Sequence, residues 1–388
     1  MKAAQDSRSF NINNVRVFDG HDLSALKAIS VSGGVIVASP VLGAKEINGH
    51  GGVLIPGLID AHIHLNTAQE LKAMARYGVT TGLDMGTWPA SKISAQRGHK
   101  HASDFRTSGA PATSPGSVHA TILPMMKSSL ISSPDEAVRF VQERLAENVD
   151  YIKMIAEDPG PDQATLDAVV VEAHRHGKLV VAHASELHAF HMAQDAHTDV
   201  ITHVPCDAAL DDTASARMAA DNQVSVPTLT MMKAIAAPFS ARVLKSLLSH
   251  PNTVLSIISA TRRRQHPSPG KPVYTNARAS VTALHRAGVP ILAGSDAHID
   301  PASPVSVVHG EALHQELELL VEAGLSCLEA LRAATVLPAR YFGLQDRGAV
   351  EGGRRADLVL LRENPLVDIR NTRSISAVWC AGVLVPLA

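Results

Sequence analysis

The stretch PGLIDAHIHL, residues Pro56–Leu65, decides the fold. It is an apolar run of strand length that ends in two histidines one residue apart. Because side chains alternate between the two faces of a strand, His62 and His64 point to the same side, roughly 6–7 Å apart along the backbone. That spacing can offer two imidazoles to one metal ion. The same H-x-H spacing recurs at 99–101 and 174–176, so the pair needs support from other parts of the chain.

The composition narrows the class of protein. The chain has 388 residues, a formal net charge of −2 and only 3% aromatic residues, which argues against a nucleic-acid-binding surface. Its three cysteines, Cys206, Cys327 and Cys380, lie far apart, so neither a disulfide framework nor a cysteine zinc site is expected. The N-terminus lacks the apolar core of a signal peptide, and no apolar run reaches membrane-spanning length. We therefore predict a soluble, cytoplasmic protein without a membrane partner.

Both ends of the chain have the pattern of short strands. Residues 10–55 alternate apolar and polar residues between glycine-containing turns, and ADLVLL, ISAVWCAG and VLVPLA near the C-terminus repeat this character. Such alternation predicts β structure. We expect the two ends to pair as one discontinuous β-sandwich domain, formed by residues 1–56 and 346–388.

The middle of the chain, residues 57–345, alternates short apolar strands with amphipathic helices. Helices are predicted at 134–147, 162–176, 186–196 and 208–221, and Ser133 and Glu136 have the spacing of a capping box. Repeated βα units imply a parallel sheet with right-handed crossovers. An α/β fold with a closed (β/α)8 TIM-type barrel fits about eight strands best. A doubly wound sheet is the alternative, but no G-x-G-x-x-G follows the first strand.

Six polar residues lie at or near the C-terminal ends of five apolar strands of this middle region. A single buried histidine is usually structural, but six such residues at equivalent strand ends form the pattern of a barrel active site. A lysine within an apolar strand needs a partner or a modification. Imidazole and carboxylate suit a zinc-like ion. The six candidates are His62, His64, Lys153, His183, His203 and Asp296.

These motifs together resemble the amidohydrolase superfamily. The resemblance rests on PGLIDAHIHL, VDYIKMI, VVAHASELHAF, VITHVP and GVPILAGSDAH, and on the C-terminal segment from HGEALHQELELL to LREN. The branch that looks most similar contains imidazolonepropionase-like and metal-dependent prolidase-like enzymes, and ochratoxin-hydrolysing enzymes. The resemblance spans nearly the whole chain and implies a barrel with a discontinuous β domain.

The resemblance also implies a role for each of the six residues. His62, His64 and Asp296 would hold the more buried of two divalent metal ions. His183 and His203 would hold the more exposed one. Lys153, carboxylated by CO2, would bridge the two ions. We expect zinc, although manganese, iron or cobalt also suits these ligands.

The expected activity is cleavage of an amide bond in a dipeptide, an N-acyl amino acid or a cyclic amide. A metal-bridged hydroxide would be the nucleophile, and Asp296 would act as general base and then as general acid. Deamination, lactone hydrolysis or lyase chemistry on the same metal site is an alternative. A catalytically silent binding or assembly protein is a second alternative of another class. By analogy with the family we also expect a homo-oligomer with a small-molecule substrate.

Four further residues are candidates for substrate contacts. His119 follows the third barrel strand in a segment with glycine and proline. His298 lies two residues beyond Asp296, and its alternative role is that of a loop residue at the barrel rim. Tyr274 and Arg278 precede the last barrel strand, and Arg278 could meet a substrate carboxylate. A surface ion pair is the alternative for Arg278.

Overall fold

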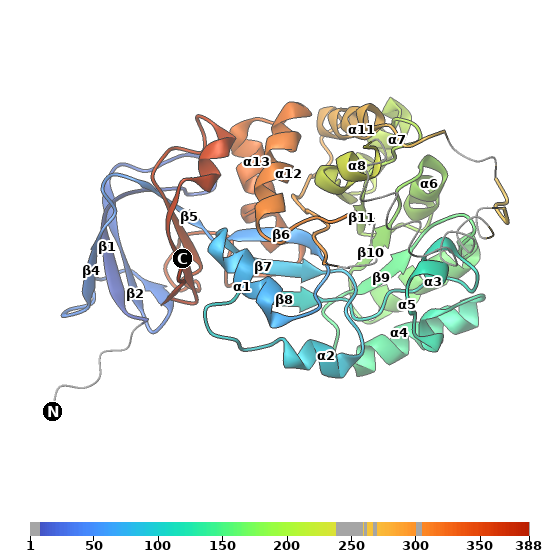
Figure 1. The fold of residues 1–388 in the computed structure, drawn as a ribbon, viewed down its shortest axis with the longest axis horizontal. Coiled ribbons are helices and arrows are strands. Elements are labelled where there is room, and N and C mark those ends of the chain that lie inside the picture. Colours follow the sequence, from blue (N-terminus) through green and yellow to red (C-terminus); the bar gives the residue numbers. More distant parts are fainter. Residues whose placement is uncertain (1–7, 238–258, 260–261, 267–269, 300–304, 388) are drawn as a thin grey trace.

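The computed structural model describes residues 8–237, 259, 262–266, 270–299 and 305–387, and these form two connected bodies (Figure 1). A small β body at one end contains strands from both ends of the chain. A larger body of strands and helices contains the middle. The predicted pairing of the two ends is thus confirmed by the strands themselves, while the domain boundaries at 56/57 and 345/346 stay a prediction.

The β body is an eight-stranded arrangement in the order β15-β14-β13-β5-β1-β2-β3, with β4 paired to β1. Strand β1 pairs first with β2 and β4 and, after an irregularity between Ile12 and Val15, with β5. This bend lets one strand serve both layers of a sandwich. The strands are β1 Phe10–Val17, β2 Lys27–Ser32, β3 Val35–Val37, β4 Lys45–Asn48, β5 Val53–Pro56, β13 Leu358–Leu361, β14 Ile375–Cys380 and β15 Val383–Leu384.

Buried side chains from both ends of the chain fill the sandwich. Phe10 stacks on Trp379 with ring centroids 5.3 Å apart, and Ile12, Leu54 and Leu358 lie in the same cluster. Strand β5 pairs with the C-terminal strand β13 and leads directly into the first strand of the barrel, Leu58–Ile63. The sandwich therefore fixes the start of the strand that carries His62.

Seven short parallel strands form the barrel wall in two sheets, β6-β7-β8 and β12-β11-β10-β9. Most of their residues are buried, as expected for strands covered by helices on the outside and by side chains within. The strands are β6 Leu58–Ile63, β7 Val79–Asp84, β8 Asp104–Thr107, β9 Ile152–Ile155, β10 Val180–His183, β11 Val200–Thr202 and β12 Val224–Val226.

Parallel bridges close the two sheets into a ring. Ala112 pairs with Met154 on one side, while Ser225 pairs with Ile291 and Ile63 with Ala297 on the other. Residues 291–297 thus form the eighth extended segment of the barrel wall, between β12 and β6. The predicted (β/α)8 barrel is confirmed, and the doubly wound alternative is wrong because a ring has no open sheet edge.

Helices cover the outside of the barrel (Figure 1). The four predicted helices are confirmed within a few residues. Around α4, Ser133 accepts the Glu136 N–H, but the Glu136 carboxylate accepts from Ser132 rather than from Ser133, so the predicted capping box is only half formed. The helices are α1 Ala68–Arg76, α2 Ala90–Ala95, α3 Val118–Ile122, α4 Pro134–Ala146, α5 Gln163–Arg175, α6 Leu187–Asp195, α7 Asp212–Ala220, α8 Leu229–Ile235, α11 Tyr274–Arg286, α12 Glu311–Glu322, α13 Cys327–Ala333 and α14 Val336–Tyr341, with 3-10 turns η1 Lys127–Ser129 and η2 Ile369–Arg373.

None of the helices in the described part of the chain is long and apolar enough to span a membrane.

Candidate metal centre

The two histidines of the opening motif lie with a carboxylate at the C-terminal end of β6. The Nε2 atoms of His62 and His64 are 3.3 Å apart. They lie 3.3 Å and 3.2 Å, respectively, from Oδ1 of Asp296. His62 is 1% exposed and Asp296 8%. Three potential ligand atoms, from β6 and the adjacent segment 291–297, therefore meet at one buried point.

Two residues of this cluster have strained backbones. His203, just after β11, has φ 71°, and Asp296 has φ 57°. Non-glycine residues rarely adopt this left-handed region, and such strain tends to occur at functional sites. His62, His203 and Asp296 each offer a ligand atom within 4.8 Å of the others. The surrounding strands thus hold both residues in conformations that bring their side chains to the common point.

Lys153 and His183 extend the cluster along the next two strands. Lys153 is 3% exposed, and its Nζ donates to Thr202 Oγ1 at 2.8 Å. The ring of His183 lies 4.4 Å from that of His203, centroid to centroid, and the ring of His203 lies 4.9 Å from that of His62. The structure therefore brings all six candidates together at or near the strand ends, and their role as metal ligands stays a prediction.

Burial sets the charges of these groups. Desolvation lowers the pKa of His203 to about 3 and holds the pKa values of His62 and His183 well below the usual range. It also lowers the pKa of Lys153 to about 7. Burial alone would raise the pKa of Asp296, but the neighbouring histidines lower it strongly. Burial therefore favours neutral imidazoles at His62, His183 and His203 beside an ionised Asp296, the protonation states that metal ligands need.

This donor set fits divalent metal ions. Imidazole nitrogens and a carboxylate are favoured zinc ligands. The Nδ1 atom of His62 is buried without a hydrogen-bond partner among the described residues, so the ring is held by packing while its Nε2 faces the cluster. Asp296 is the one carboxylate among the six candidate residues, and bound divalent metal ions would balance its negative charge.

A histidine–glutamate pair adjoins the candidate metal ligands. Glu157 lies just beyond β9, and its Oε2 is 2.9 Å from Nδ1 of His119. Thr113 donates a further bond to Oε1 at 3.0 Å. The ring of His119 contacts that of His183 at 4.5 Å, centroid to centroid. Burial opposes charge on His119, but the Glu157 carboxylate outweighs it and raises the pKa of His119. The pair thus places a cationic group at the edge of the cluster.

The other three predicted substrate contacts lie in different surroundings. The ring nitrogens of His298 contact the main-chain carbonyls of Asp296 and Val305 at 3.0 and 3.1 Å, so this residue holds a rim loop. Tyr274 packs against the helix layer, and its buried hydroxyl has no hydrogen-bond partner among the described residues. Arg278 is exposed on α11. The structure does not bring Tyr274 into the cluster of metal ligands.

Several residues that orient the ligands were missed in the sequence. Asp60 accepts bonds from Ser295 Oγ at 2.6 Å and from the N–H of His62 at 3.2 Å, and so ties β6 to the segment that carries Asp296. His309 Nε2 lies 2.9 Å from the carbonyl of His64. Glu157 follows β9, so the strand-end rule could have found it, whereas Asp60 lies within β6 and its only signal is its place in the quoted motif.

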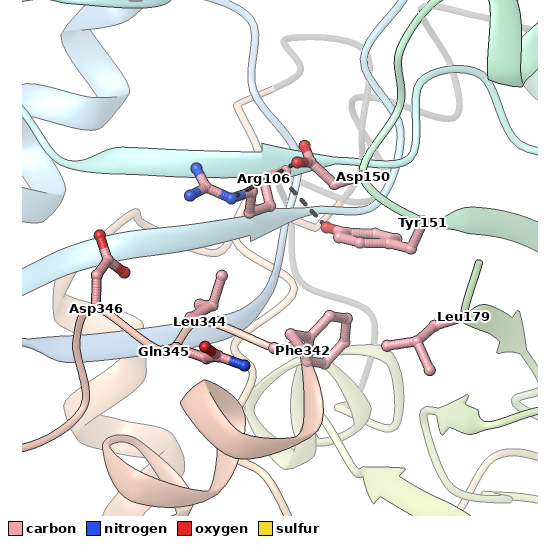
Figure 2. Close-up of a pocket in the computed structure, with 9 residues that line it drawn as sticks. Arg106, Asp150, Tyr151, Leu179, Phe342, Leu344, Gln345 and Asp346 are labelled. Carbon is pink, nitrogen blue, oxygen red and sulfur yellow. Dashed lines mark hydrogen bonds and ion pairs between the residues drawn. The ribbon is translucent and has the colours of Figure 1, made fainter. Parts of the chain in front are cut away.

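Cavities lie at both ends of the barrel. One of about 300 Å³ lies among the loops that follow β9, β10 and β11, lined by residues such as Asp158, His188 and Arg264. Another of about 420 Å³ lies at the opposite end, where Tyr151 and Phe342 meet beside Arg106 (Figure 2). Only the first lies at the end of the barrel where the metal ligands lie.

Comparison with known proteins gives a family for this arrangement. The amidohydrolase family model matches residues 53–385. The chain is 24% identical over 373 residues to an adenine deaminase of Gluconobacter oxydans, which covers 90% of the chain and 54% of the deaminase. An adenine deaminase of Bacillus licheniformis is 23% identical over 388 residues, covering 95% of the chain and 57% of the deaminase. The chain thus spans about half the length of these two relatives.

Solved structures share the whole fold. A Xaa-Pro dipeptidase with bound methionine aligns with a TM-score of 0.78 at 20% identity, covering 97% of this chain and 99% of the other. A prolidase-like protein from Bifidobacterium longum aligns at 0.76 and 24% identity, covering 97% and 94%. The ochratoxinase of A. niger aligns at 0.71 and 19%, covering 98% and 96%. At these identities the likeness concerns the fold.

Proposed function

The chain belongs to the amidohydrolase family, and on that premise we propose that it is a metal-dependent hydrolase that cleaves an amide bond in a small molecule. The observation that carries the proposal is the convergence of His62, His64 and Asp296 with His203, all at strand ends of one barrel. The proposed substrates are dipeptides, N-acyl amino acids and cyclic amides.

We propose that two divalent ions, zinc in the first instance, occupy the cluster. His62, His64 and Asp296 would hold one ion, and His183 and His203 the other. Lys153 would bridge them as a carbamate. Support for the carbamate comes from burial, because a lysine whose pKa is lowered to about 7 is largely neutral at slightly alkaline pH, and only the neutral amine can react with CO2. The ions would supply an acidified water and polarise the scissile carbonyl.

The side chains around the ions would move protons and orient the substrate. Asp296 stays ionised because of its histidine neighbours, so it can accept a proton from the attacking water and deliver it to the leaving nitrogen. His119, held by Glu157, would direct its charge toward an anionic oxygen of the substrate.

Deamination is the second candidate function. It is favoured by the two adenine deaminases that align with 90% and 95% of this chain. The same water activation would serve, with an amino group of a ring as the leaving group.

A cytoplasmic location and a homo-oligomeric state also stay predictions.

The first test is the metal content of the protein prepared with zinc and bicarbonate. We expect about two ions per chain in the wild type, falling to about one or fewer in Lys153→Ala. Lys178→Ala is the matched control, because Lys178 is a partly buried lysine whose Nζ donates to the carbonyl of Val149 just before β9, at the opposite end of the barrel. It should keep both ions.

The same preparations are then assayed with prolyl dipeptides, N-acyl amino acids, cyclic amides and adenine. Turnover of an amide that requires both ions supports the proposal. Turnover of adenine alone would move deamination ahead. Metal binding without any turnover would revive the binding-protein alternative, and a wild type that binds no metal would refute the proposal.

A further inference from the structure

The hydroxyl of Thr228 does not cap the helix that it precedes. Thr228 is the N-cap residue of α8, yet its side chain makes no capping hydrogen bond. Its Oγ1 lies instead 2.7 Å from Nδ1 of His203. A threonine at this position usually accepts a bond from the N–H groups of the first turn. The hydroxyl has thus been diverted from α8 to a candidate metal ligand.

A carboxylate from another helix takes over the capping. Glu316 lies in α12, 86 residues beyond Thr230 in the sequence. Its Oε1 accepts the N–H of Leu229 at 2.9 Å, and its Oε2 accepts the N–H of Thr230 at 2.7 Å. The Thr230 hydroxyl donates to Oε2 as well, at 2.9 Å. Glu316 therefore satisfies the N–H groups of the first two residues of α8, including that of Thr230, which a threonine cap could have accepted.

This arrangement has an energetic cost. Thr228 has φ 50°, and a β-branched residue in the left-handed region is strained. Glu316 is 0% exposed, and burial raises its pKa to about 7 even though three donors face it. An ordinary threonine cap would need neither the strain nor the buried carboxylate. The costs are explained if the conformation of Thr228 matters elsewhere.

We propose that Glu316 is a positioning residue of the metal centre, which caps α8 in place of Thr228 and so leaves the Thr228 hydroxyl to orient His203. A partner on the second ring nitrogen of a metal-binding histidine fixes the tautomer and the direction of the ring. With Nδ1 donating to Thr228, the lone pair of Nε2 is free for a metal ion. The inference rests on the proposed function, in which His203 is a ligand.

The test measures the zinc dissociation constant by competition with a chromophoric chelator, starting from metal-free protein. Thr228→Val removes the hydroxyl at nearly constant volume and should raise the constant about 10- to 100-fold. Glu316→Gln should raise it about 10-fold. Because Glu316 acts through Thr228, the double variant should bind zinc no more weakly than Thr228→Val alone.

A matched control separates positioning from stability. Asp357 is also a buried carboxylate, and it accepts the N–H of Ala381 in the β body. Asp357→Asn should lower the urea midpoint of the protein without changing the zinc dissociation constant. The absorption spectrum of the cobalt-loaded protein gives a second readout, because its ligand-field bands should shift in Thr228→Val and Glu316→Gln but not in Asp357→Asn.

Thr230→Val keeps the test open if Glu316→Gln does not fold. It removes one of the three donors to Glu316 and should raise the dissociation constant by a few-fold. The inference is overturned if Glu316→Gln, or Thr230→Val in its place, loses stability with unchanged zinc affinity and cobalt spectrum. It is also overturned if the two effects multiply in the double variant. A wild type that binds no zinc would instead refute the proposed function and remove the premise.

Discussion

The two ends of the barrel differ in how their charges are balanced. At the end opposite the metal ligands, Asp104 accepts ion pairs from Arg347 and Arg355 at 2.9 Å and from Arg106 at 3.2 Å. We call these four residues the basal network. Arg347 also pairs with Asp346 at 2.8 Å. Every charge there has an opposite charge in contact.

At the end of the barrel that carries the candidate metal ligands, which we call the metal end, not every polar group has such a partner. Asp296 is surrounded by imidazoles that burial keeps neutral, and the Nδ1 atom of His62 has no partner within the described residues. The basal network is balanced by the chain's own residues, whereas the other end contains a His/His/Asp group that could hold a metal ion.

The largest expected effect is on catalysis. Asp296→Asn should lower kcat/KM about 10³-fold or more, because it removes both a metal ligand and the proposed proton carrier. Steady-state kinetics on an amide found in the screen measures this loss. Asp104→Asn at the basal end is the control and should keep kcat/KM within a factor of about two. Equal losses in both variants would contradict the division between the two ends.

The second expected effect is acid sensitivity of the metal-free protein. The folded pKa of His203 is about 3, below the unfolded value of about 6.5, so the unfolded state binds more protons below pH 6.5. The free energy of unfolding should therefore decrease as the pH is lowered. His203 alone should account for a decrease of about 2 kcal/mol at pH 5. Burial acts on His62 and His183 in the same direction.

Urea unfolding of metal-free and zinc-loaded protein between pH 7 and pH 5 measures this effect. Zinc should reduce the loss, because a bound ion keeps the imidazoles unprotonated in the folded state. A metal-free protein that is as stable at pH 5 as at pH 7 would show that these histidines are not held neutral.

The contrast between the two ends also shows what a sequence can reveal. The convergence of the six candidate ligands could be predicted because each lies at or near the end of an apolar strand, and the barrel brings strand ends together. The basal network could not, since Arg347 and Arg355 meet Asp104 from more than 240 residues away in the sequence. The bounds of the third barrel strand, β8, are hard to predict for a different reason, because its charged residues Asp104 and Arg106 mask its burial.

The supporting residues of the metal end illustrate the same limit. Glu316 lies in the stretch HQELELL, where a glutamate has the pattern of an exposed helix position. Its partners, Leu229 and Thr230, belong to α8. Local periodicity assigns a residue to a helix, but it does not show which neighbouring element that residue will contact.

The third expected effect concerns the pair beside the ligands. Glu157→Gln removes the charge that holds His119 in place and should lower kcat/KM about 10- to 100-fold with metal content unchanged. Glu172→Gln is the matched control, because Glu172 also contacts a histidine, His176, at 3.3 Å, but on the outer helix α5. A loss of metal in Glu157→Gln would mean that the pair supports the ligands rather than the substrate.

The smallest expected effect lies in the basal network. Burial opposes ionisation of Asp104, but Arg347, Arg355 and Arg106 outweigh it and lower the pKa of its carboxyl to about 2. Because this value lies below the unfolded one, the stabilisation is fully present above about pH 4 and is lost as the pH falls toward 2. Asp104→Asn should therefore reduce the free energy of unfolding by about 2 kcal/mol at pH 7.

Urea unfolding of the wild type and of Asp104→Asn at pH 7 and at pH 3 measures this difference, which should shrink by about half at the lower pH. Zinc affinity serves as the internal control and should be the same in both proteins. A pH-independent difference would show that Asp104 stabilises the barrel by packing rather than by charge. A change in zinc affinity would show that the two ends are coupled, and the basal network would then have to be treated as part of the metal centre.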